Sequence, residues 1–217
     1  STLFPYTTLF RSTNRVNGSY VLHQFFRHFL ISIYGVIFAS VVAIPIGFFI
    51  ARRYRLSGIV ISTANVIQTV PSLAMISILM IFMGLGVNTV IIAVFLYSLL
   101  PIIKNTYTGV KSVDENLVDV AKSMGMSKKQ IIMKIELPLS MSIIMAGIRN
   151  ALVMAVGVTA IGTFIGAGGL GDIITRGIKV SNGSAIIMAG ALPTALMAVI
   201  SDFLLQFVEK ILDPVKR

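Results

Sequence analysis

Five long apolar stretches constrain the fold of this sequence more than any other feature. They cover residues 29–51, 58–83, 88–103, 139–165 and 185–207. A helix needs about 20 mostly apolar residues to cross the hydrocarbon core of a bilayer. Of the 217 residues, 56% are hydrophobic and 12% are charged, whereas about 25% of an ordinary soluble domain is charged. The sequence therefore predicts an all-α polytopic membrane protein with five transmembrane helices, for which the lipid bilayer is part of the solvent.

A proline interrupts the second stretch. Proline removes a backbone N–H and clashes with the preceding turn, so Pro71 predicts either a kink or two half-helices. Gln68, Thr69 and Ser72 place polar groups beside it. Irregular backbone at membrane depth is tolerated only where it lines a cavity or is buried in protein. We therefore predict that Gln68, Thr69, Pro71 and Ser72 line a translocation path.

The distribution of basic residues predicts the orientation. Twelve lysines and arginines lie between the first and second stretches, between the third and fourth, and after the fifth. The segments on the other side carry Arg11, Arg15, Arg27, Arg176 and Lys179. The positive-inside rule then places the N-terminus outside and the C-terminus on the cytoplasmic side of the plasma membrane. The net charge of +10 is mostly this asymmetry, so nucleic-acid binding is not expected.

The longest polar connection, residues 104–138, is predicted to contain two short helices. The patterns S-x-x-E at 112–115 and S-x-x-Q at 127–130 are typical of capping boxes. Gly125 stands where a left-handed helix end favours glycine. Between these signals, apolar residues recur at helical spacing outside the bilayer: Leu117, Val120, Ala121 and Met124.

This connection resembles the EAA motif, E-A-A-x3-G-x9-I-x-L-P, of permeases in binding-protein-dependent ABC importers. The matching residues are Asp119, Val120, Ala121, Gly125, Ile135, Leu137 and Pro138. Asp119 replaces the family's glutamate and Val120 its first alanine, and both departures are mild. The resemblance implies that the seven residues belong to a coupling helix that docks in a groove of an ATPase subunit. The alternative is an amphipathic helix that lies on the lipid headgroups.

The stretches 68–74, 96–109 and 165–172 extend the resemblance to the permeases of glycine betaine/carnitine/choline importers. It implies a type I importer permease of the MetI-like fold over residues 20–212, with a small compatible solute as substrate. The implied partners are a cytoplasmic ABC ATPase dimer, an extracellular substrate-binding protein and a second permease chain. ATP is then bound by the partner, and no cofactor is expected on this chain.

The two ends of the chain are expected to lie outside this domain. Residues 1–19 form a predicted extracellular segment, and residues 213–217 form a predicted cytoplasmic tail. The first twelve residues are unlike the rest of the sequence, and we expect that they do not belong to the native protein.

The glycines Gly166, Gly168, Gly169 and Gly171 satisfy G-x-G-x-x-G. This is not a dinucleotide signal, because the pattern follows a membrane helix rather than a strand. We predict an external turn that either closes an outer gate or allows close approach of the binding protein. The alternative is a flexible connection.

Arg149 lies eleven residues after Pro138, about 16 Å further along a helix. An arginine at mid-bilayer costs about 2.5–3.5 kcal/mol on insertion scales. We therefore expect Arg149 to line an inner cavity or to pair with Asp202. The alternative is that the helix starts well outside the membrane and Arg149 reaches the headgroups.

Three other functional classes are disfavoured. The sequence has no G-x-x-x-x-G-K-[ST] pattern, so the chain is not the ATPase. It has no cysteine and eight acidic residues, and His23 and His28 are predicted to lie outside the packed spans, so neither a catalytic nor a metal site is expected. A secondary transporter or channel-like subunit remains the alternative, but that class usually has internal repeats and ionisable groups at the midplane.

Overall fold

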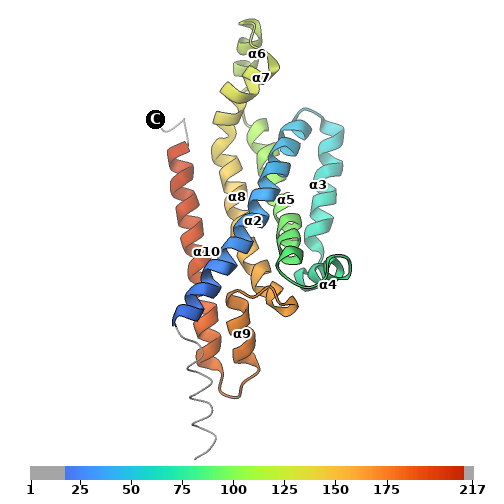
Figure 1. Ribbon diagram of the computed structural model, residues 1–217. Coiled ribbons are helices and arrows are strands. Elements are labelled where there is room, and N and C mark those ends of the chain that lie inside the picture. The colour runs from blue at the N-terminus through green and yellow to red at the C-terminus, as the bar shows by residue number, and fades with distance from the viewer. Residues whose placement is uncertain (1–17, 213–217) are drawn as a thin grey trace, which may run out of the picture.

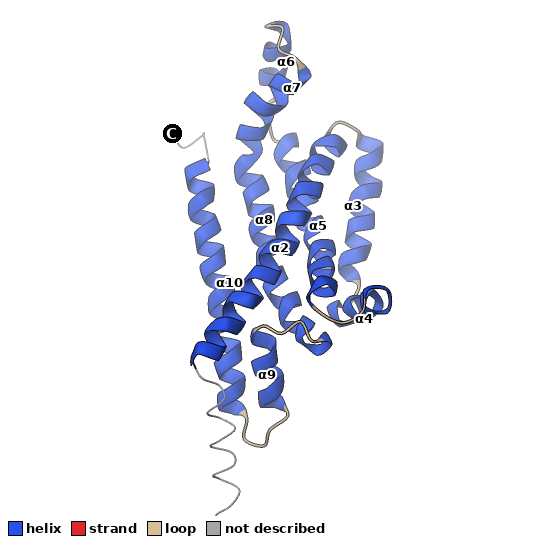
Figure 2. Ribbon diagram, in the orientation of Figure 1, coloured by secondary structure: helices blue, strands red, loops and turns tan. Residues whose placement is uncertain are grey.

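Long helices run side by side through most of the molecule. The computed structural model describes residues 18–212 (Figure 1). Its four longest α-helices are α2 (Gly18–Ala51), α5 (Val87–Lys111), α8 (Leu137–Ile161) and α10 (Ser184–Leu212). The described residues contain helices and loops but no strand (Figure 2). The all-α prediction is confirmed.

The second predicted span is broken in two. Helix α3 (Tyr54–Thr69) and helix α4 (Ser72–Met83) meet at an angle of 95°. Val70 and Pro71 are extended at the junction, and the Tyr97 hydroxyl donates a hydrogen bond to the carbonyl of Val70. The prediction that Pro71 splits this segment is confirmed. Four helices of the described residues are long and apolar enough to cross a membrane, and the number is five if the bent pair is one span.

Two spans are longer than their apolar stretches. Helix α2 begins at Gly18 instead of residue 29, and α5 continues to Lys111 instead of ending at residue 103. The added turns carry polar residues, among them Gln24, His28 and Thr106, that are buried between helices. A search for continuous apolar stretches does not detect such buried polar residues. The predicted connection 104–138 therefore begins only after Lys111.

Small residues hold α2, α5 and α8 together at close range. A Cβ on Gly47 of α2 would lie 2.5 Å from the Cβ of Thr106 on α5, and a Cβ on Gly147 of α8 would lie 2.7 Å from the Cβ of Asn105. Lipid gives helices no hydrophobic reason to associate, so close backbone approach and van der Waals contact must hold the bundle. These contacts surround the main apolar core, in which Ala39, Val90 and Ala93 are fully buried.

The connection after α5 projects beyond the other helices (Figure 1). It contains α6 (Glu115–Ser123) and α7 (Lys128–Ile131), and a π-helical turn, η1 (Ile132–Glu136), joins α7 to α8 without a break. We call α6 and α7 the hairpin.

At the other end of α8 lie a 3₁₀ turn, η2 (Gly162–Ile165), and the short helix α9 (Leu170–Ile178), which packs beside α10. The sequence pattern predicted a turn here and no helix corresponding to α9.

Candidate functional site: the α6–α7 hairpin and the α8–α10 groove

Two different signals start the helices of the hairpin. Asp114 caps α6, because its carboxylate accepts a hydrogen bond of 2.9 Å from the amide of Asn116. The predicted box at 112–115 is wrong: α5 extends to Lys111, so Ser112 instead donates to the carbonyl of Gly109 at 2.8 Å. The predicted box at Ser127 is confirmed by a 2.7 Å bond from its amide to the side chain of Gln130, and by the reciprocal bond at 3.3 Å.

Gly125 forms the tip of the hairpin. Its φ of 80° is in the left-handed region, as predicted. The Gly125 amide donates to the carbonyl of Lys122 at 2.9 Å, and the Met126 amide donates to that of Ala121 at 3.1 Å. This pair of bonds is a Schellman motif. A Cβ on Gly125 would meet no atom within 4 Å, so backbone conformation rather than space explains the glycine in this chain.

One face of the hairpin is apolar and open. Leu117, Val120 and Met124 are 50%, 58% and 78% exposed. Beside them runs a groove of about 410 Å³, whose lining also includes Ile135 and Pro138. An exposed apolar surface outside the membrane spans is the usual sign of a protein partner or a lipid surface.

The seven EAA-like residues do not share one face. Four of them line the apolar groove: Val120, Ala121, Ile135 and Pro138. Asp119 lies on another side, where it pairs with Lys122 at 2.8 Å. Leu137 packs toward α2 near Phe48, and Gly125 is at the tip. The structure thus gives these residues four different positions within one small unit.

An ion pair that the sequence pattern did not predict ties the base of the hairpin to α2. Arg52, just after α2, contacts Glu136 in η1 and donates to the carbonyl of Phe48 at 3.0 Å. Glu136 is 8% exposed. The sequence feature that could have indicated this ion pair is Glu136 itself, a lone acidic residue directly before Leu137-Pro138 in a lysine-rich segment. Because η1 continues into α8, the ion pair connects the hairpin, α2 and α8.

Arg149 on α8 pairs with two acids on α10. Its Nε lies 2.8 Å from Oδ1 of Asp202, an ion pair without hydrogen-bond alignment, and its Nη1 donates to Oε2 of Glu209 at 3.2 Å. The expected pairing with Asp202 is confirmed. Glu209 is a second partner that the sequence did not indicate.

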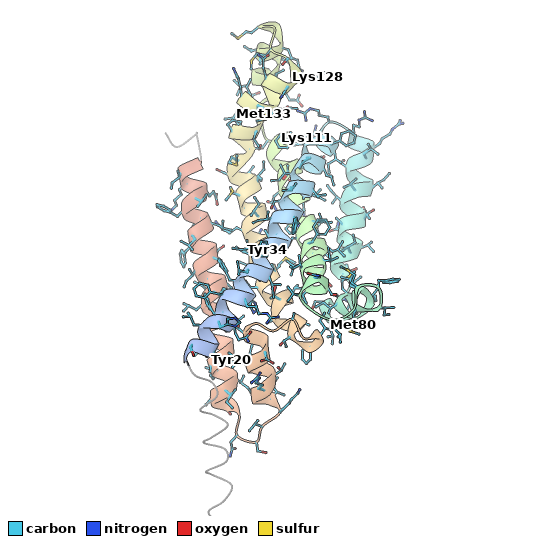
Figure 3. All side chains as sticks on the ribbon, viewed as in Figure 1. Tyr20, Tyr34, Met80, Lys111, Lys128 and Met133 are labelled. Carbon is cyan, nitrogen blue, oxygen red and sulfur yellow. The ribbon has the colours of Figure 1, made fainter. Side chains whose placement is uncertain are left out.

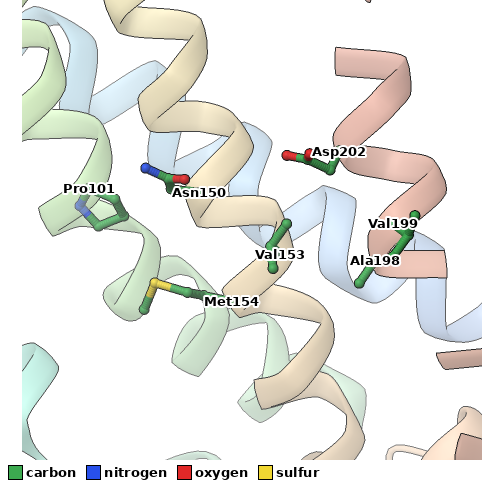
Figure 4. A pocket seen from close by; sticks show the side chains of 7 residues that line it. All are labelled: Pro101, Asn150, Val153, Met154, Ala198, Val199 and Asp202. Carbon is green, nitrogen blue, oxygen red and sulfur yellow. The ribbon is translucent and has the colours of Figure 1, made fainter. Parts of the chain in front are cut away.

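Asp202 also lines a groove between α5, α8 and α10. The groove has a volume of about 610 Å³. Its lining is Pro101, Asn150, Val153, Met154, Ala198, Val199 and Asp202. Figure 4 shows Asp202 pointing from α10 toward α8, and Asn150 on the flank of α8 nearer Pro101. Arg149 is not part of the lining, so it meets the groove only through Asp202.

Of the residues around Pro71, only Gln68 approaches this groove. Its amide lies 3.5 Å from the sulfur of Met154, which lines the groove. Thr69 donates to the carbonyl of Val66 at 2.7 Å and is exposed. Pro71 is exposed and Ser72 half-buried at the bend. The structure does not bring Thr69, Pro71 and Ser72 to the groove.

The glycine-rich turn is held by side chains of α2. Gln24 accepts a bond of 2.6 Å from the amide of Gly169, and Nδ1 of His28 accepts one of 3.3 Å from that of Leu170. Nε2 of His28 lies 2.9 Å from the carbonyl of Val156 and so acts as the donor there. His28 is fully buried, so its expected place outside the packed spans is wrong. The described residues contain no cluster of metal-ligating side chains.

The glycines of this turn differ in their surroundings. Gly166, Gly168 and Gly169 have φ between 74° and 87°, whereas Gly171 is helical. Gly169 and Gly171 are buried, and Gly166 is exposed. A Cβ on Gly169 would lie 3.1 Å from Nδ1 of His28. The turn is thus packed against α2 and cannot be regarded as a loose connection.

A membrane permease is the class of protein that this helical bundle and its projecting hairpin define. Residues 43–217 match the family described as "Binding-protein-dependent transport system inner membrane component", and the chain belongs to this family.

Two curated relatives cover nearly the whole chain. It is 62% identical over 202 residues to the carnitine transport permease protein OpuCD of Listeria monocytogenes serotype 1/2a (strain 10403S), covering 93% of this chain and 91% of the relative. It is 60% identical over 201 residues to the glycine betaine/carnitine/choline transport system permease protein OpuCD of Bacillus subtilis (strain 168), covering 93% and 88%.

A solved structure shares the fold. It is an inward-facing form of the MetNI methionine ABC transporter, with a TM-score of 0.80 and 17% identity over 89% of this chain and 96% of that one. The predicted type I importer permease fold is confirmed. The chain is a polytopic membrane component of a transport system and not its catalyst.

Proposed function

We propose that this chain forms the translocation pathway of an ATP-driven importer for a small quaternary-ammonium solute of the glycine betaine, carnitine or choline type. One observation carries the substrate class: about 60% identity over 93% of the chain to two permeases named for these solutes. Identity at this level over the whole membrane domain supports a shared substrate class and leaves the preferred member of that class to experiment.

The hairpin is the proposed docking site for an ATPase, which binds and hydrolyses the ATP. Three features support this role. Leu117, Val120 and Met124 offer apolar surface that a partner would cover. The Ser127 capping box and the Schellman turn at Gly125 fix the hairpin's shape. Finally, η1 joins the hairpin directly to α8, so movement of a docked partner would reach the groove-lining residues.

The groove between α5, α8 and α10 is the proposed wall of the pathway. Beside it, α8 exposes Asn150, Val153 and Gly157 at helical spacing. An exposed stripe with a glycine allows another helix to approach closely. We propose that a second permease chain covers this stripe and that the solute passes between the two chains. The acid Asp202 in the groove lining supports passage of a cationic group.

The proposed orientation has the hairpin in the cytoplasm and the glycine-rich turn with α9 outside. The junction of α2 and α3 lies at the same end of the bundle as the hairpin (Figure 1). This junction carries Arg52, Arg53 and Arg55, and α7 carries Lys128 and Lys129, which supports this orientation by the positive-inside rule. An extracellular binding protein would then deliver solute to the end that carries α9.

Transport by the reconstituted complex tests the proposal. The chain, its co-purifying ATPase and the binding protein are reconstituted in vesicles. Uptake of labelled choline, carnitine and glycine betaine is then measured with and without ATP on the side of the membrane that carries the hairpin. We expect uptake that requires ATP and the binding protein. Uptake that continues without ATP and collapses with an ion gradient would instead indicate a secondary transporter.

A further inference from the structure

A third groove, separate from the two described above, runs between the end of α2 and the α7–η1–α8 segment. Its volume is about 580 Å³. Its lower part is lined by apolar side chains only: Ile44, Pro45, Phe48, Phe49, Ile132, Met133 and Leu137. Its rim carries three cations: Arg52, Arg53 and Lys128. Figure 3 labels Lys128 and Met133 at the hairpin end of the molecule.

The charges on the rim do not cancel. Glu136 neutralises Arg52. Arg53 lies over the ring of Phe49, 5.0 Å from its centre, and neither Arg53 nor Lys128 forms an ion pair with any residue between 18 and 212. Both side chains are exposed. The rim is therefore a cationic site with two uncompensated charges directly above apolar walls.

The depth of the groove identifies its occupant. Ile44 lies seven residues before the end of α2 at Ala51, which is about 10 Å along the helix axis. One leaflet of hydrocarbon is about 15 Å thick, so the groove spans most of a leaflet. A protein partner docked on the hairpin meets only its rim, whereas an acyl chain reaches its full length. Free phosphate matches the rim and leaves the apolar walls exposed.

We propose that this groove binds one anionic phospholipid, with its phosphate between Arg53 and Lys128 and an acyl chain along Ile44, Phe48 and Leu137. Basic pockets between transmembrane helices on the cytoplasmic side suit such headgroups. The lipid touches α2 on one side and η1 on the other, so it fills the interface next to the Arg52–Glu136 ion pair. This site is independent of which solute the importer carries.

Native mass spectrometry of the purified chain with its co-purifying subunits tests the headgroup. The protein is taken from vesicles of equal parts phosphatidylglycerol and phosphatidylcholine, and the retained lipids are counted. In the double variant Arg53→Gln/Lys128→Gln we expect the retained ratio of phosphatidylglycerol to phosphatidylcholine to fall roughly 30-fold, the effect of two basic residues at an anionic surface. The matched control is Arg55→Gln/Lys129→Gln, which removes the same charge outside the groove.

A second pair of variants tests the acyl chain. Ile44→Trp fills the groove, and Val41→Trp places the same ring on the exposed face of α2 outside it. We expect phosphatidylglycerol to be lost from the first variant only. Equal retention by groove and control variants in both experiments would overturn the proposal. Loss of the ATPase from Arg53→Gln/Lys128→Gln with phosphatidylglycerol still bound would also overturn it, because the cations would then serve the protein partner.

Discussion

Arg149 on α8 and Asp202 on α10 form an ion pair in which Nε and Oδ1 are 2.8 Å apart. The same arginine reaches Glu209 two turns further along α10. One cation thus joins two helices at two heights, beside the groove that Asp202 lines.

Arg149→Gln should lower the stability of the bundle. It leaves two carboxylates near each other without a cation. Breaking a fully buried pair costs about 3–5 kcal/mol, and the partial exposure of these side chains reduces the expected loss to about 1–2 kcal/mol. Thermal unfolding in detergent measures it. Lys104→Gln removes the same charge from an exposed position on α5 and should leave the midpoint unchanged. Equal midpoints for both variants would contradict a structural role of the ion pair.

Gly125→Asp should prevent association with the ATPase while the chain still inserts in the membrane. Aspartate tolerates left-handed backbone, and a Cβ has open space at this position, so the hairpin should keep its shape. The new carboxylate would project into the proposed interface. Co-purification of the ATPase measures the effect, and Gly125→Asn separates charge from size. Undiminished association of both variants would count against docking at this tip.

Met124→Glu should weaken the same association by disrupting the apolar face. Burying a methionine contributes about 1.5–3 kcal/mol, which corresponds to a loss of roughly 10- to 100-fold in affinity. Ile178→Glu changes an exposed apolar residue at the opposite end, on α9, and serves as the control. If Met124→Glu binds the ATPase as the parent chain does, the apolar face is not the contact.

His28→Ala should loosen the glycine-rich turn. The substitution removes the acceptor of the Leu170 amide and the donor to Val156. We expect faster hydrogen exchange at Gly169 and Leu170, and a loss of stability of about 2–5 kcal/mol for the buried cavity. His23→Ala alters an exposed histidine on the same helix and should change neither quantity. Unchanged exchange in His28→Ala would show that Gln24 alone holds the turn.

Gly162→Ala should destabilise the contact between α5 and the end of α8. Its Cβ would lie 2.5 Å from Cγ2 of Val90, and overpacking of this kind costs about 1–3 kcal/mol. Val90→Ala removes the clashing carbons, so the double variant should lose less than the sum of the two single variants. Gly58→Ala on α3 is the control, because a Cβ there meets no atom within 4 Å. Strict additivity would contradict the contact.

The sequence predicted the fold where one strong physical constraint decided the local structure. Length and apolar content located every span, Pro71 located the break, and Gly125 located the left-handed turn. These features depend on residues close in sequence. The ends of α2 and α5 were misplaced because polar residues such as Gln24 and Thr106 are buried against other helices, a pairing between distant segments that apolar windows do not contain.

The candidate site was predicted in part for the same reason. An arginine within a membrane span needs a carboxylate partner, and Asp202 lies at a matching depth on another span. The contacts Arg52–Glu136 and Gln24–Gly169 join residues far apart in the chain, so the spacing of neighbouring residues does not predict which residues pair. The division of the EAA-like residues among four surroundings follows from the three-dimensional path of the hairpin and has no counterpart in their spacing.

The unbroken helical run from Lys128 to Ile165 has a mechanical consequence. Its 38 residues make a rod about 57 Å long. If such a rod tilts by roughly 10° about its middle, each end moves by about 5 Å in opposite directions. No hinge is needed in between. A displacement of Lys128 at one end therefore moves the glycine-rich turn at the other end in the opposite direction. Motion on one face of the membrane is thus transmitted directly to the other face.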